Sequence, residues 1–443
     1  MSISDNSLSL FNRDIFVYST KLITGAIIAR ILGPIGLGIW IIFEMIPSYC
    51  EAFGRLKFDI ASVYYLGQKK YGLGEITFLL NITSLISSFI LITLIFINID
   101  LIDVYLFKDL EINPIVLYIV LLYIPLLFIS INYQYIFIHL GDITAYNILI
   151  IIKGVLSSVI SIFLLLVFDM GIVAMAIGLV IAHFIAVLYS YWKVHKIENM
   201  KYKIKRVLLV DMAKYSYKLY FSGLVSHFSN YISSLIVVLL LGPAQVAFYQ
   251  LGKSRIELLS KIPSSIGTII HPLMSNADQS ILQSSKLLSQ SIRISLVLMS
   301  TSGVLACIFI YPLTLLLYGK DFIPLVIPFW ILAPSIIVFY SCSLVTPYFL
   351  SVGRPDIPLK ISLIPIIPQV FFCYFFIPKF GISGAALSAA LSFLIISFVQ
   401  IIVFKKFTGI TYSNIIIPKI EDYKLILNFI KRKLKPYLLK INP

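Results

Sequence analysis

The sequence is short of charged residues. Asp, Glu, Lys and Arg make up 12% of its 443 residues, whereas hydrophobic residues make up 59%. Soluble domains carry roughly 25% charged residues, so a water-soluble surface on a chain of this length would need about twice the charge present. We therefore predict that most of the surface faces lipid and that the chain is an all-α integral membrane protein.

Cysteine, histidine and nucleotide-binding loops are also scarce or missing. The four cysteines form no Cys-x-x-Cys pair and the five histidines have no metal-ligand spacing, which argues against a disulfide framework and a zinc site. The "LGKS" at 251–254 resembles the end of a phosphate-binding loop, but Ala247 stands where that loop needs its first glycine. We predict no cofactor, no metal and no direct use of ATP.

Acidic residues are fewer than basic ones, and the formal net charge is +15. The basic residues gather in short segments between apolar runs, which is typical of membrane topology rather than of nucleic-acid binding. With a cytoplasmic N-terminus, the inner connections and the C-terminal tail hold most of the Lys and Arg, whereas the outer connections hold only three lysines beside six acidic residues. The pattern predicts a multi-pass protein of the cytoplasmic membrane with both termini in the cytoplasm and no nucleic-acid partner.

Twelve stretches are apolar enough to cross a bilayer, since a spanning helix needs about 20 mainly apolar residues. The uncharged stretch from Leu219 to Gly252 is too long for one span, and "LGP" at 241–243 breaks it into two. The predicted spans are 12–33, 35–56, 76–99, 114–138, 144–168, 171–192, 216–241, 244–270, 288–311, 323–350, 357–378 and 381–404.

The two halves of the chain repeat each other. The "LGPIGLGIW" at 32–40 matches "LGPAQVAFY" at 241–249, and "GIVAMA" at 171–176 matches "GISGAA" at 381–386, at offsets of 209 and 210 residues. Because six is an even number of spans, both halves enter the membrane in the same direction, which makes a parallel repeat. The predicted parts are an N-terminal six-helix lobe (1–192), a basic cytoplasmic linker (193–214), a C-terminal six-helix lobe (215–404) and a basic cytoplasmic or interfacial tail (405–443).

Within the tail, the stretch from Ile420 to Ile441 mixes apolar residues with Lys and Arg. It fits an interfacial amphipathic helix on anionic lipid as well as it fits a solvated basic tail.

Charged residues at membrane depth are costly and usually face a cavity or a partner. Counted from the "LGP" turn, Lys21 and Glu44 lie at similar depth in neighbouring antiparallel helices and are expected to pair. Lys253 and Glu257 are four residues apart on one helix face, and Arg255 points elsewhere.

Lysine and arginine suit phosphate and carboxylate ligands, so one hypothesis is a cationic central cavity, and the other is internal ion pairing that locks helices together. The candidate substrate-binding residues are Lys21, Arg30, Lys153, Lys253 and Arg255. Glu44 and Glu257 are either pair partners or sites for a coupling cation. His183 and His227 are expected to form hydrogen bonds between helices rather than a proton relay.

Four motifs in order resemble one family. They are "ARILGPIGLGIW" at 29–40, the stretch that begins "LGPAQVAFYQLGKSRIELLSKIP" at 241, "LYGKDFIPLVIPFWILAPS" at 317–335, and the stretch from 350 to 392 with its Gly-Arg-Pro loop and "IPKFGISGAA". They are similar to the O-antigen-type, Wzx-like polysaccharide flippases of the multidrug/oligosaccharidyl-lipid/polysaccharide (MOP) exporter superfamily. The resemblance covers nearly the whole chain and implies a MATE-like fold.

The resemblance implies a flippase for polyprenyl-pyrophosphate-linked oligosaccharide that works as a monomer by alternating access. Its cationic lumen would accommodate the pyrophosphate, and an H⁺ or Na⁺ gradient would drive transport. Many relatives have fourteen spans, so twelve weaken a match to the lipid II flippase branch.

Two alternatives stay open. One is a multidrug or small-molecule antiporter of the same superfamily, which would use an acidic N-lobe residue such as Glu44. The other is a membrane polymerase or ligase, which the short connection at about 100–113 disfavours because such an enzyme needs a large outer loop with catalytic groups. We expect no enzymatic activity.

Overall fold

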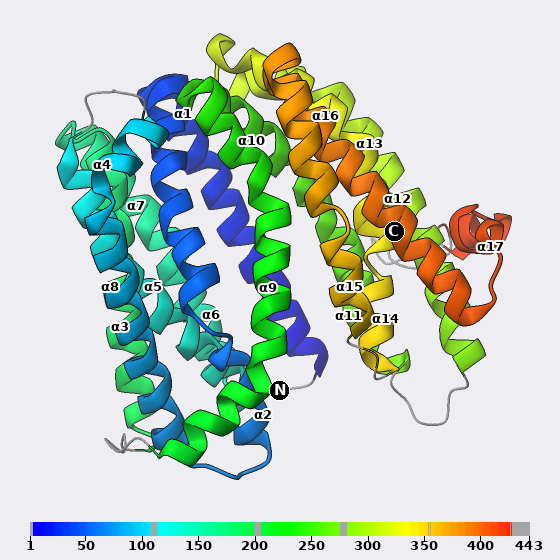
Figure 1. Cartoon of the computed structure of the whole chain (residues 1–443), viewed down its shortest axis with the longest axis horizontal. Helices are drawn as coiled ribbons and strands as arrows, with labels where there is room; N and C mark the ends of the chain where they lie inside the picture. The colour runs from blue at the N-terminus through cyan, green and yellow to red at the C-terminus, as the bar shows by residue number, and fades with distance from the viewer. Residues whose placement is uncertain are drawn as a thin grey trace, which may run out of the picture. The chain divides into compact units, whose positions relative to one another are not determined.

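The computed structural model describes residues 3–107, 113–198, 205–274, 281–352, 354, 356–425 and 427 (Figure 1). In these residues all regular structure is helical. Nine of the described helical stretches are long and apolar enough to cross a membrane. Dividing α1 (Ile3–Gly54) and α16 (Ile366–Thr408) at their non-helical glycines, and counting the more polar α10–α11 stretch, brings the nine to twelve, as predicted.

The helices follow one another with short connections. After α1 come α2 (Phe58–Gly67), α3 (Leu73–Ile97), α4 (Ile99–Ile102), η1 (Asp103–Phe107), α5 (Pro114–Leu140), α6 (Ile143–Ile151), η2 (Ile152–Leu156), α7 (Ser157–Val167), α8 (Ile172–His195), α9 (Arg206–Leu241), α10 (Pro243–Glu257), η3 (Leu258–Ser260), α11 (Lys261–Met274), α12 (Ile281–Leu317), η4 (Lys320–Leu325), α13 (Val326–Cys342), α14 (Val345–Ser351), α15 (Asp356–Leu363), α16 and α17 (Tyr412–Ile416).

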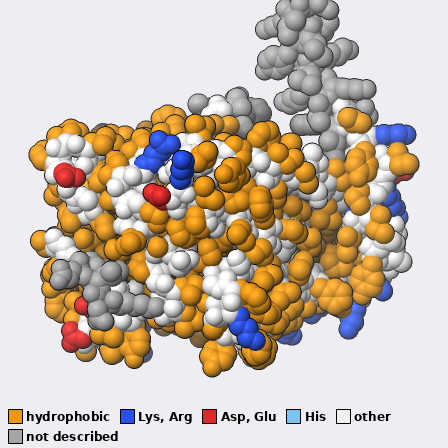
Figure 2. All heavy atoms as spheres, turned by 90° about the horizontal axis from the view of Figure 1, so that it is seen from above, with side chains coloured by type: hydrophobic (Ala, Val, Ile, Leu, Met, Phe, Trp, Pro, Cys, Tyr) orange, Lys and Arg blue, Asp and Glu red, His pale blue; other side chains and the backbone are white. Residues whose placement is uncertain are grey.

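The surface carries large apolar side chains that water would not tolerate in such number. Phe89 and Ile97 on α3 and Ile367 and Tyr374 on α16 are more than two-thirds exposed. Figure 2 shows one face on which hydrophobic side chains predominate and charged ones are isolated. Such a surface is favourable in contact with the hydrocarbon chains of a bilayer. Helices satisfy their own backbone hydrogen bonds in that environment, so the chain is a multi-pass membrane protein.

Glycines with positive φ occur at matching places in the two repeats. Gly33 and Gly242, both inside an "LGP" motif, have φ of 65° and 93°. Gly171 and Gly381, which open the second matched motif, have (φ, ψ) of (55°, −134°) and (55°, −133°). Only glycine adopts such angles without strain, so each motif ends one helix and sets the direction of the next. The sequence repeat therefore corresponds to a repeat in backbone conformation.

The chain forms two compact units. Unit 1 comprises Met1–Phe228, Leu241–Ala247 and Leu316–Phe322, and unit 2 comprises Ser229–Leu240, Phe248–Leu315 and Ile323–Pro443. In unit 1, α5 packs against α1, α3 and α8, and the core includes Tyr133 and Phe137. In unit 2, α13 packs against α16, and the core includes Tyr348 and Phe404. The lobe boundaries predicted from the sequence stay a prediction.

The C-terminal tail is attached to unit 2 by a buried ion pair. Asp422 accepts hydrogen bonds from Arg293 of α12, Nε at 2.7 Å and Nη2 at 3.1 Å, and from the Lys419 backbone amide at 2.8 Å. Arg293 also donates to the Asn414 carbonyl. Most of the interfacial helix predicted for the tail, from 428 onward, lies outside the described residues.

Candidate functional site

Two predicted site lysines lie next to each other in unit 1. Lys21 is on α1, and Lys153 is in η2, a π-helical turn between α6 and α7. A Cβ placed on Gly154 would lie 2.9 Å from Val17 Cγ1, so the glycine beside Lys153 lets η2 pack closely against the part of α1 that carries Lys21. Single π-turns within α-helices occur frequently at functional sites. We call Lys21 and Lys153 the lysine pair.

Two carboxylates of α1 face the lysine pair. Glu44 interacts electrostatically with Lys21 and accepts a hydrogen bond from the Trp40 side chain. Glu51 interacts electrostatically with Lys153. Residues seven apart lie on one helix face, so the second half of α1 presents both carboxylates to the same side.

A buried histidine interacts electrostatically with both members of the lysine pair. His183 of α8 is 3% exposed, its Nδ1 lies 3.0 Å from the Leu179 carbonyl, and its Nε2 lies 3.3 Å from Tyr123 Oη of α5. Since the carbonyl can only accept, Nδ1 carries a proton and donates to it. His183 therefore joins α5 and α8 by a hydrogen bond, as predicted from the sequence.

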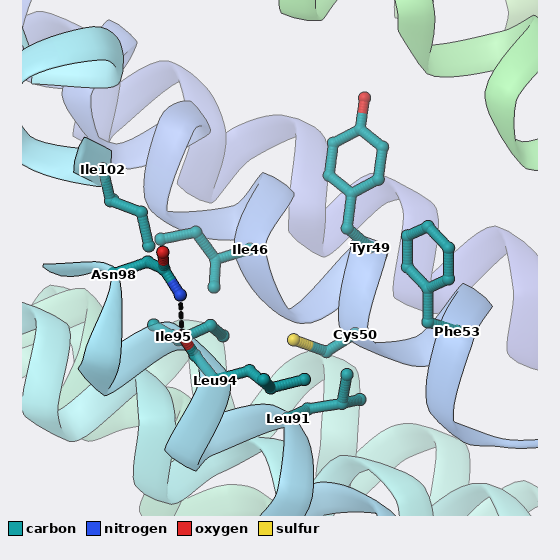
Figure 3. A pocket seen from close by; sticks show the side chains of 9 residues that line it. All are labelled: Ile46, Tyr49, Cys50, Phe53, Leu91, Leu94, Ile95, Asn98 and Ile102. Carbon is teal, nitrogen blue, oxygen red and sulfur yellow. Dashed lines mark hydrogen bonds between the residues drawn. The ribbon is translucent and has the colours of Figure 1, made fainter.

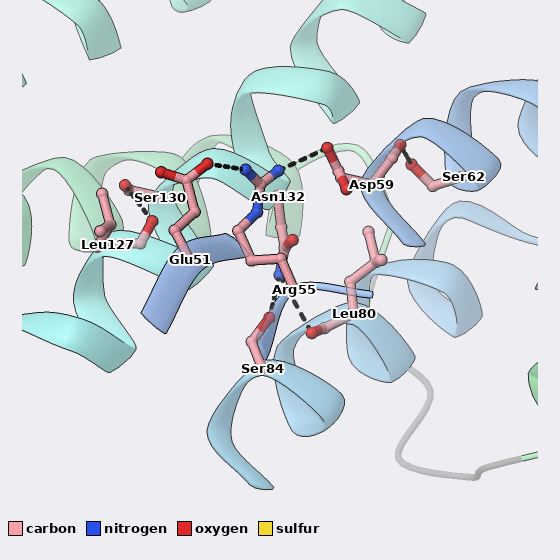
Figure 4. Close-up of polar contacts among 9 residues, drawn as sticks. All are labelled: Glu51, Arg55, Asp59, Ser62, Leu80, Ser84, Leu127, Ser130 and Asn132. Atoms are coloured by element: carbon pink, nitrogen blue, oxygen red, sulfur yellow. Dashed lines mark hydrogen bonds and ion pairs between the residues drawn. The ribbon is translucent and has the colours of Figure 1, made fainter. Parts of the chain in front are cut away.

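Glu51, Arg55 and Asp59 form an ion-paired triad (Figure 4). Arg55 Nη1 is 2.5 Å from Glu51 Oε1, and Arg55 Nη2 is 2.5 Å from Asp59 Oδ2. The side chains of Arg55 and Asp59 are 5% and 1% exposed, whereas that of Glu51 is 34% exposed. Arg55 and Asp59 were not among the predicted site residues, although the i, i+4 spacing in "EAFGRLKFD" at 51–59 favours such pairing.

The triad spans a break in the chain's second spanning segment. The helix α1 ends at Gly54, α2 begins at Phe58, and Leu56 and Lys57 between them have φ of 52° and 57°. Non-glycine residues in this region cost about 1–3 kcal/mol each, so the surrounding structure must hold them there. Arg55 does this by pairing with one carboxylate before the break and one after it.

The opposite face of the same segment lines an apolar cavity of about 300 Å³ (Figure 3). Its walls come from α1 and from the α3–α4 region. The amide on its wall, Asn98, donates to the Leu94 carbonyl of its own helix at 2.8 Å. The lining residues are Ile46, Tyr49, Cys50, Phe53, Leu91, Leu94, Ile95, Asn98 and Ile102. Such a cavity suits hydrocarbon and not a charged group.

The predicted cations of unit 2 are arranged differently. Lys253 of α10 is 5% exposed, donates to the Asn230 carbonyl at 2.5 Å, and has its Nζ 3.8 Å from Glu257. The predicted i, i+4 proximity of Lys253 and Glu257 is thus present. Arg255 is partly buried on the same helix.

Arg30 contacts a helix end. It lies on α1, and its Nε donates to the Leu317 carbonyl at 2.9 Å, while Nη2 donates to the Leu316 carbonyl. These carbonyls belong to the last turn of α12 and have no partner within the helix. The guanidinium thereby satisfies a helix C-terminus and favours its dipole.

An all-α chain of about twelve spanning segments is a polytopic membrane protein. The sequence matches the family described as polysaccharide biosynthesis protein over residues 27–327, more than half of its length, and the chain belongs to that family. A comparison with curated proteins finds no match.

Solved structures of transporters share the fold. The lipid II flippase MurJ in an inward closed conformation superposes with a TM-score of 0.76 at 16% identity, covering 90% of this chain and 87% of that one. An inward-facing multidrug resistance MATE family transporter of the MOP superfamily gives 0.68 at 15% identity, with 88% and 94% covered. A point mutant of the Vibrio cholerae MATE transporter VcmN gives 0.60 at 16% identity, with 92% and 95% covered. The chain therefore has the fold of these transporters.

Proposed function

We propose that this protein is a flippase for polyprenyl-pyrophosphate-linked oligosaccharide. In this proposal it carries polysaccharide repeat units across the cytoplasmic membrane by alternating access, with both termini in the cytoplasm and an ion gradient as the driving force. Membership of the polysaccharide biosynthesis family and the fold shared with a lipid II flippase support the class of substrate.

The lysine pair is the observation that carries the proposal. Two like charges placed together within spanning helices repel each other and are costly in hydrocarbon. Lys21 and Lys153 come from segments more than 130 residues apart, and they interact electrostatically with each other. An anionic ligand with several acceptor oxygens, such as a pyrophosphate, relieves that repulsion by binding both ammonium groups.

The remaining predicted cations divide between two roles in this proposal. Arg255 stays a predicted anion contact. Arg30 and Lys253 donate to backbone carbonyls, so we assign them to holding helices in place.

The apolar cavity in unit 1 supports a substrate with a hydrocarbon part. It lies on the opposite face of α1 from Glu44 and Glu51. In this proposal, a lipid chain and a charged headgroup of one substrate would contact different faces of the same helix. The same lysine pair disfavours a cationic drug as substrate, because a drug cation would add to the positive charge. A multidrug antiporter is therefore the weaker alternative.

Replacing Lys153 by Met tests the proposal. We expect the variant to bind farnesyl pyrophosphate, a short polyprenyl pyrophosphate, at least tenfold more weakly, which corresponds to about 1.4 kcal/mol. In proteoliposomes it should also lose most flipping of a polyprenyl-pyrophosphate-linked sugar. Binding is measured by isothermal titration calorimetry on the full chain, and flipping by the accessibility of the sugar to an added lectin.

Lys360→Met is the matched control, since the Lys360 side chain is 78% exposed. It should bind and flip as the wild type does. Equal binding by wild type, Lys153→Met and Lys360→Met, together with efflux of a cationic dye, would replace the flippase proposal with the antiporter.

A further inference from the structure

The chain turns back on itself after α16. That helix ends at Thr408, Gly409 follows with φ of 75°, and α17 lies beside the end of α16 (Figure 1). Ile415 of α17 is fully buried and belongs to the same core cluster as Phe404 of α16. We call residues 412–425, which come after this turn, the return segment.

The return segment is held level with the ends of the spanning helices. Asp422 is joined to Arg293 of α12 by two hydrogen bonds. Arg293 lies five residues after 288, where its span is predicted to begin, which is about 7.5 Å further along the helix axis. Phe404, which shares a core cluster with the segment, lies four residues before the end of α16. The segment therefore lies at the edge of the apolar part of unit 2 and not beyond it.

Large apolar side chains of the return segment are exposed. Ile417 and Ile420 are 60% and 75% exposed, and Ile416, Tyr423 and Leu425 are exposed as well. Five such side chains within ten residues are unfavourable in water. They are favourable at the boundary between lipid headgroups and acyl chains, where interfacial segments place their apolar side chains.

The charges next to these apolar side chains are mainly basic. Lys406, Lys419 and Lys424 are exposed, and Glu421 is the only exposed acidic residue in the return segment. The other acidic residue, Asp422, is buried in its ion pair. Apolar side chains flanked by lysines are complementary to a bilayer surface that carries anionic lipid.

A lysine and a tyrosine meet where the return segment begins. Lys405 Nζ, near the end of α16, lies 3.8 Å from the centre of the Tyr412 ring. The ring is 41% exposed. Tyrosine is enriched at the level of the headgroups because one end of its side chain is apolar and the other is polar. This contact fits the same boundary between hydrocarbon and water.

We propose that the return segment is an interfacial anchor that binds the anionic lipid headgroups of the membrane that this chain spans. Its isoleucines contact the acyl chains close to the headgroups, and Lys419 and Lys424 contact lipid phosphates. The Arg293–Asp422 pair keeps the anchor at this depth because it joins the segment to a spanning helix. The inference concerns the lipid around the protein and does not depend on the proposed substrate.

Tryptophan fluorescence of the full-length protein tests the position of the anchor. Ile420→Trp adds a fluorophore to the three native tryptophans, in vesicles of equal parts phosphatidylcholine and phosphatidylglycerol. Bromine atoms on acyl chains quench tryptophan at short range. Because interfacial segments lie about 5–10 Å into the headgroup and acyl boundary, we expect brominated lipid to remove about half or more of the added fluorescence. Gln68→Trp, in the exposed connection between α2 and α3, is the control and should lose little.

The same fluorophore tests the choice of lipid when bromine is carried by only one of the two lipids. We expect Ile420→Trp to be quenched more by brominated phosphatidylglycerol than by brominated phosphatidylcholine. Lys419→Gln and Lys424→Gln should each reduce that preference about fivefold, since a lysine near an anionic surface contributes about 1 kcal/mol. Glu421→Gln should increase the preference. Lys379→Gln, which removes an exposed lysine one span earlier, should leave it unchanged.

Three results would overturn the proposal. If iodide in the water quenches Ile420→Trp and brominated lipid does not, the segment lies in solution. If neither quenches it, a second copy or another protein covers these side chains. If both lipids quench it equally, or if the two lysine variants keep the wild-type preference, the anchor does not bind anionic headgroups.

Discussion

Unit 1 and unit 2 each hold a buried or half-buried lysine in a spanning helix, and the two lysines have opposite surroundings. Lys253 donates to the Asn230 carbonyl at 2.5 Å and lies near Glu257. Lys153 stands beside a second cation, Lys21, and shares its carboxylate Glu51 with Arg55. A lysine at membrane depth is thus either satisfied by the protein or available to a ligand, and its partners decide which.

The two units also differ in where their buried ion pairs lie. Unit 1 places Arg55–Asp59 across a break in a spanning segment, and unit 2 places Arg293–Asp422 between α12 and the tail. The first pair holds a strained backbone, and the second attaches a chain end. Three variants test whether the buried charges of the two units differ in what they contribute to stability and to binding.

Asp422→Asn is expected to have the largest effect. It removes the only carboxylate at Arg293 among the described ion pairs, and breaking a buried pair costs about 3–5 kcal/mol. We expect a lowered unfolding free energy at pH 7, measured by denaturation of the purified protein in mixed micelles. Asp356→Asn is the control, because the Arg354–Asp356 pair is about half exposed and should contribute about 1 kcal/mol or less.

The Asp422 effect should depend on pH. Burial raises the pKa of Asp422, but the hydrogen bonds from Arg293 and Lys419 outweigh it and hold the pKa below its usual range. A carboxyl with a lowered folded-state pKa stabilises above its unfolded pKa of about 3.9, and that contribution is lost as the pH falls through the folded value. The difference between wild type and Asp422→Asn should shrink below about pH 4; a constant difference would contradict the ion pair.

Asp59→Asn should cause the second-largest loss of stability. Arg55 keeps Glu51 as a partner, so we expect a loss near the lower end of the range for a broken buried pair, about 3 kcal/mol. Because the pair holds Leu56 and Lys57 at positive φ, the loss should be accompanied by faster amide hydrogen exchange at 54–60. Unchanged exchange there would mean that packing alone maintains the break.

Lys253→Met should have the smallest effect on stability and nearly none on binding. Removing a charged hydrogen bond to a backbone carbonyl costs roughly 1.5–3 kcal/mol, part of which the apolar methionine recovers. Farnesyl pyrophosphate affinity should stay within about twofold of wild type, far from the tenfold loss expected of Lys153→Met. Equal losses in the two variants would contradict the assignment of Lys253 to holding helices in place.

Much of the fold could be predicted from the sequence because it follows local rules. Runs of apolar residues with almost no charge predict spanning helices, and the "LGP" and "GI" motifs mark where glycine conformations end them. The site was predicted only in part. Lys21 and Lys153 were named one by one, but nothing local in the sequence shows that two segments so far apart along the chain bring these lysines together.

The lipid environment, the helical class and the repeat can be predicted from the sequence alone, because hydrocarbon permits only helices in such apolar segments and because the glycine breaks recur about 210 residues apart. The partners of the individual charges follow from how the helices pack. Lys253 and Arg30 are satisfied by carbonyls of other segments, and the lysine pair arises from helices distant along the chain. Groups that are distant along the chain determine the free energy of a buried charge, and the packing of the helices determines which of those groups lie next to it.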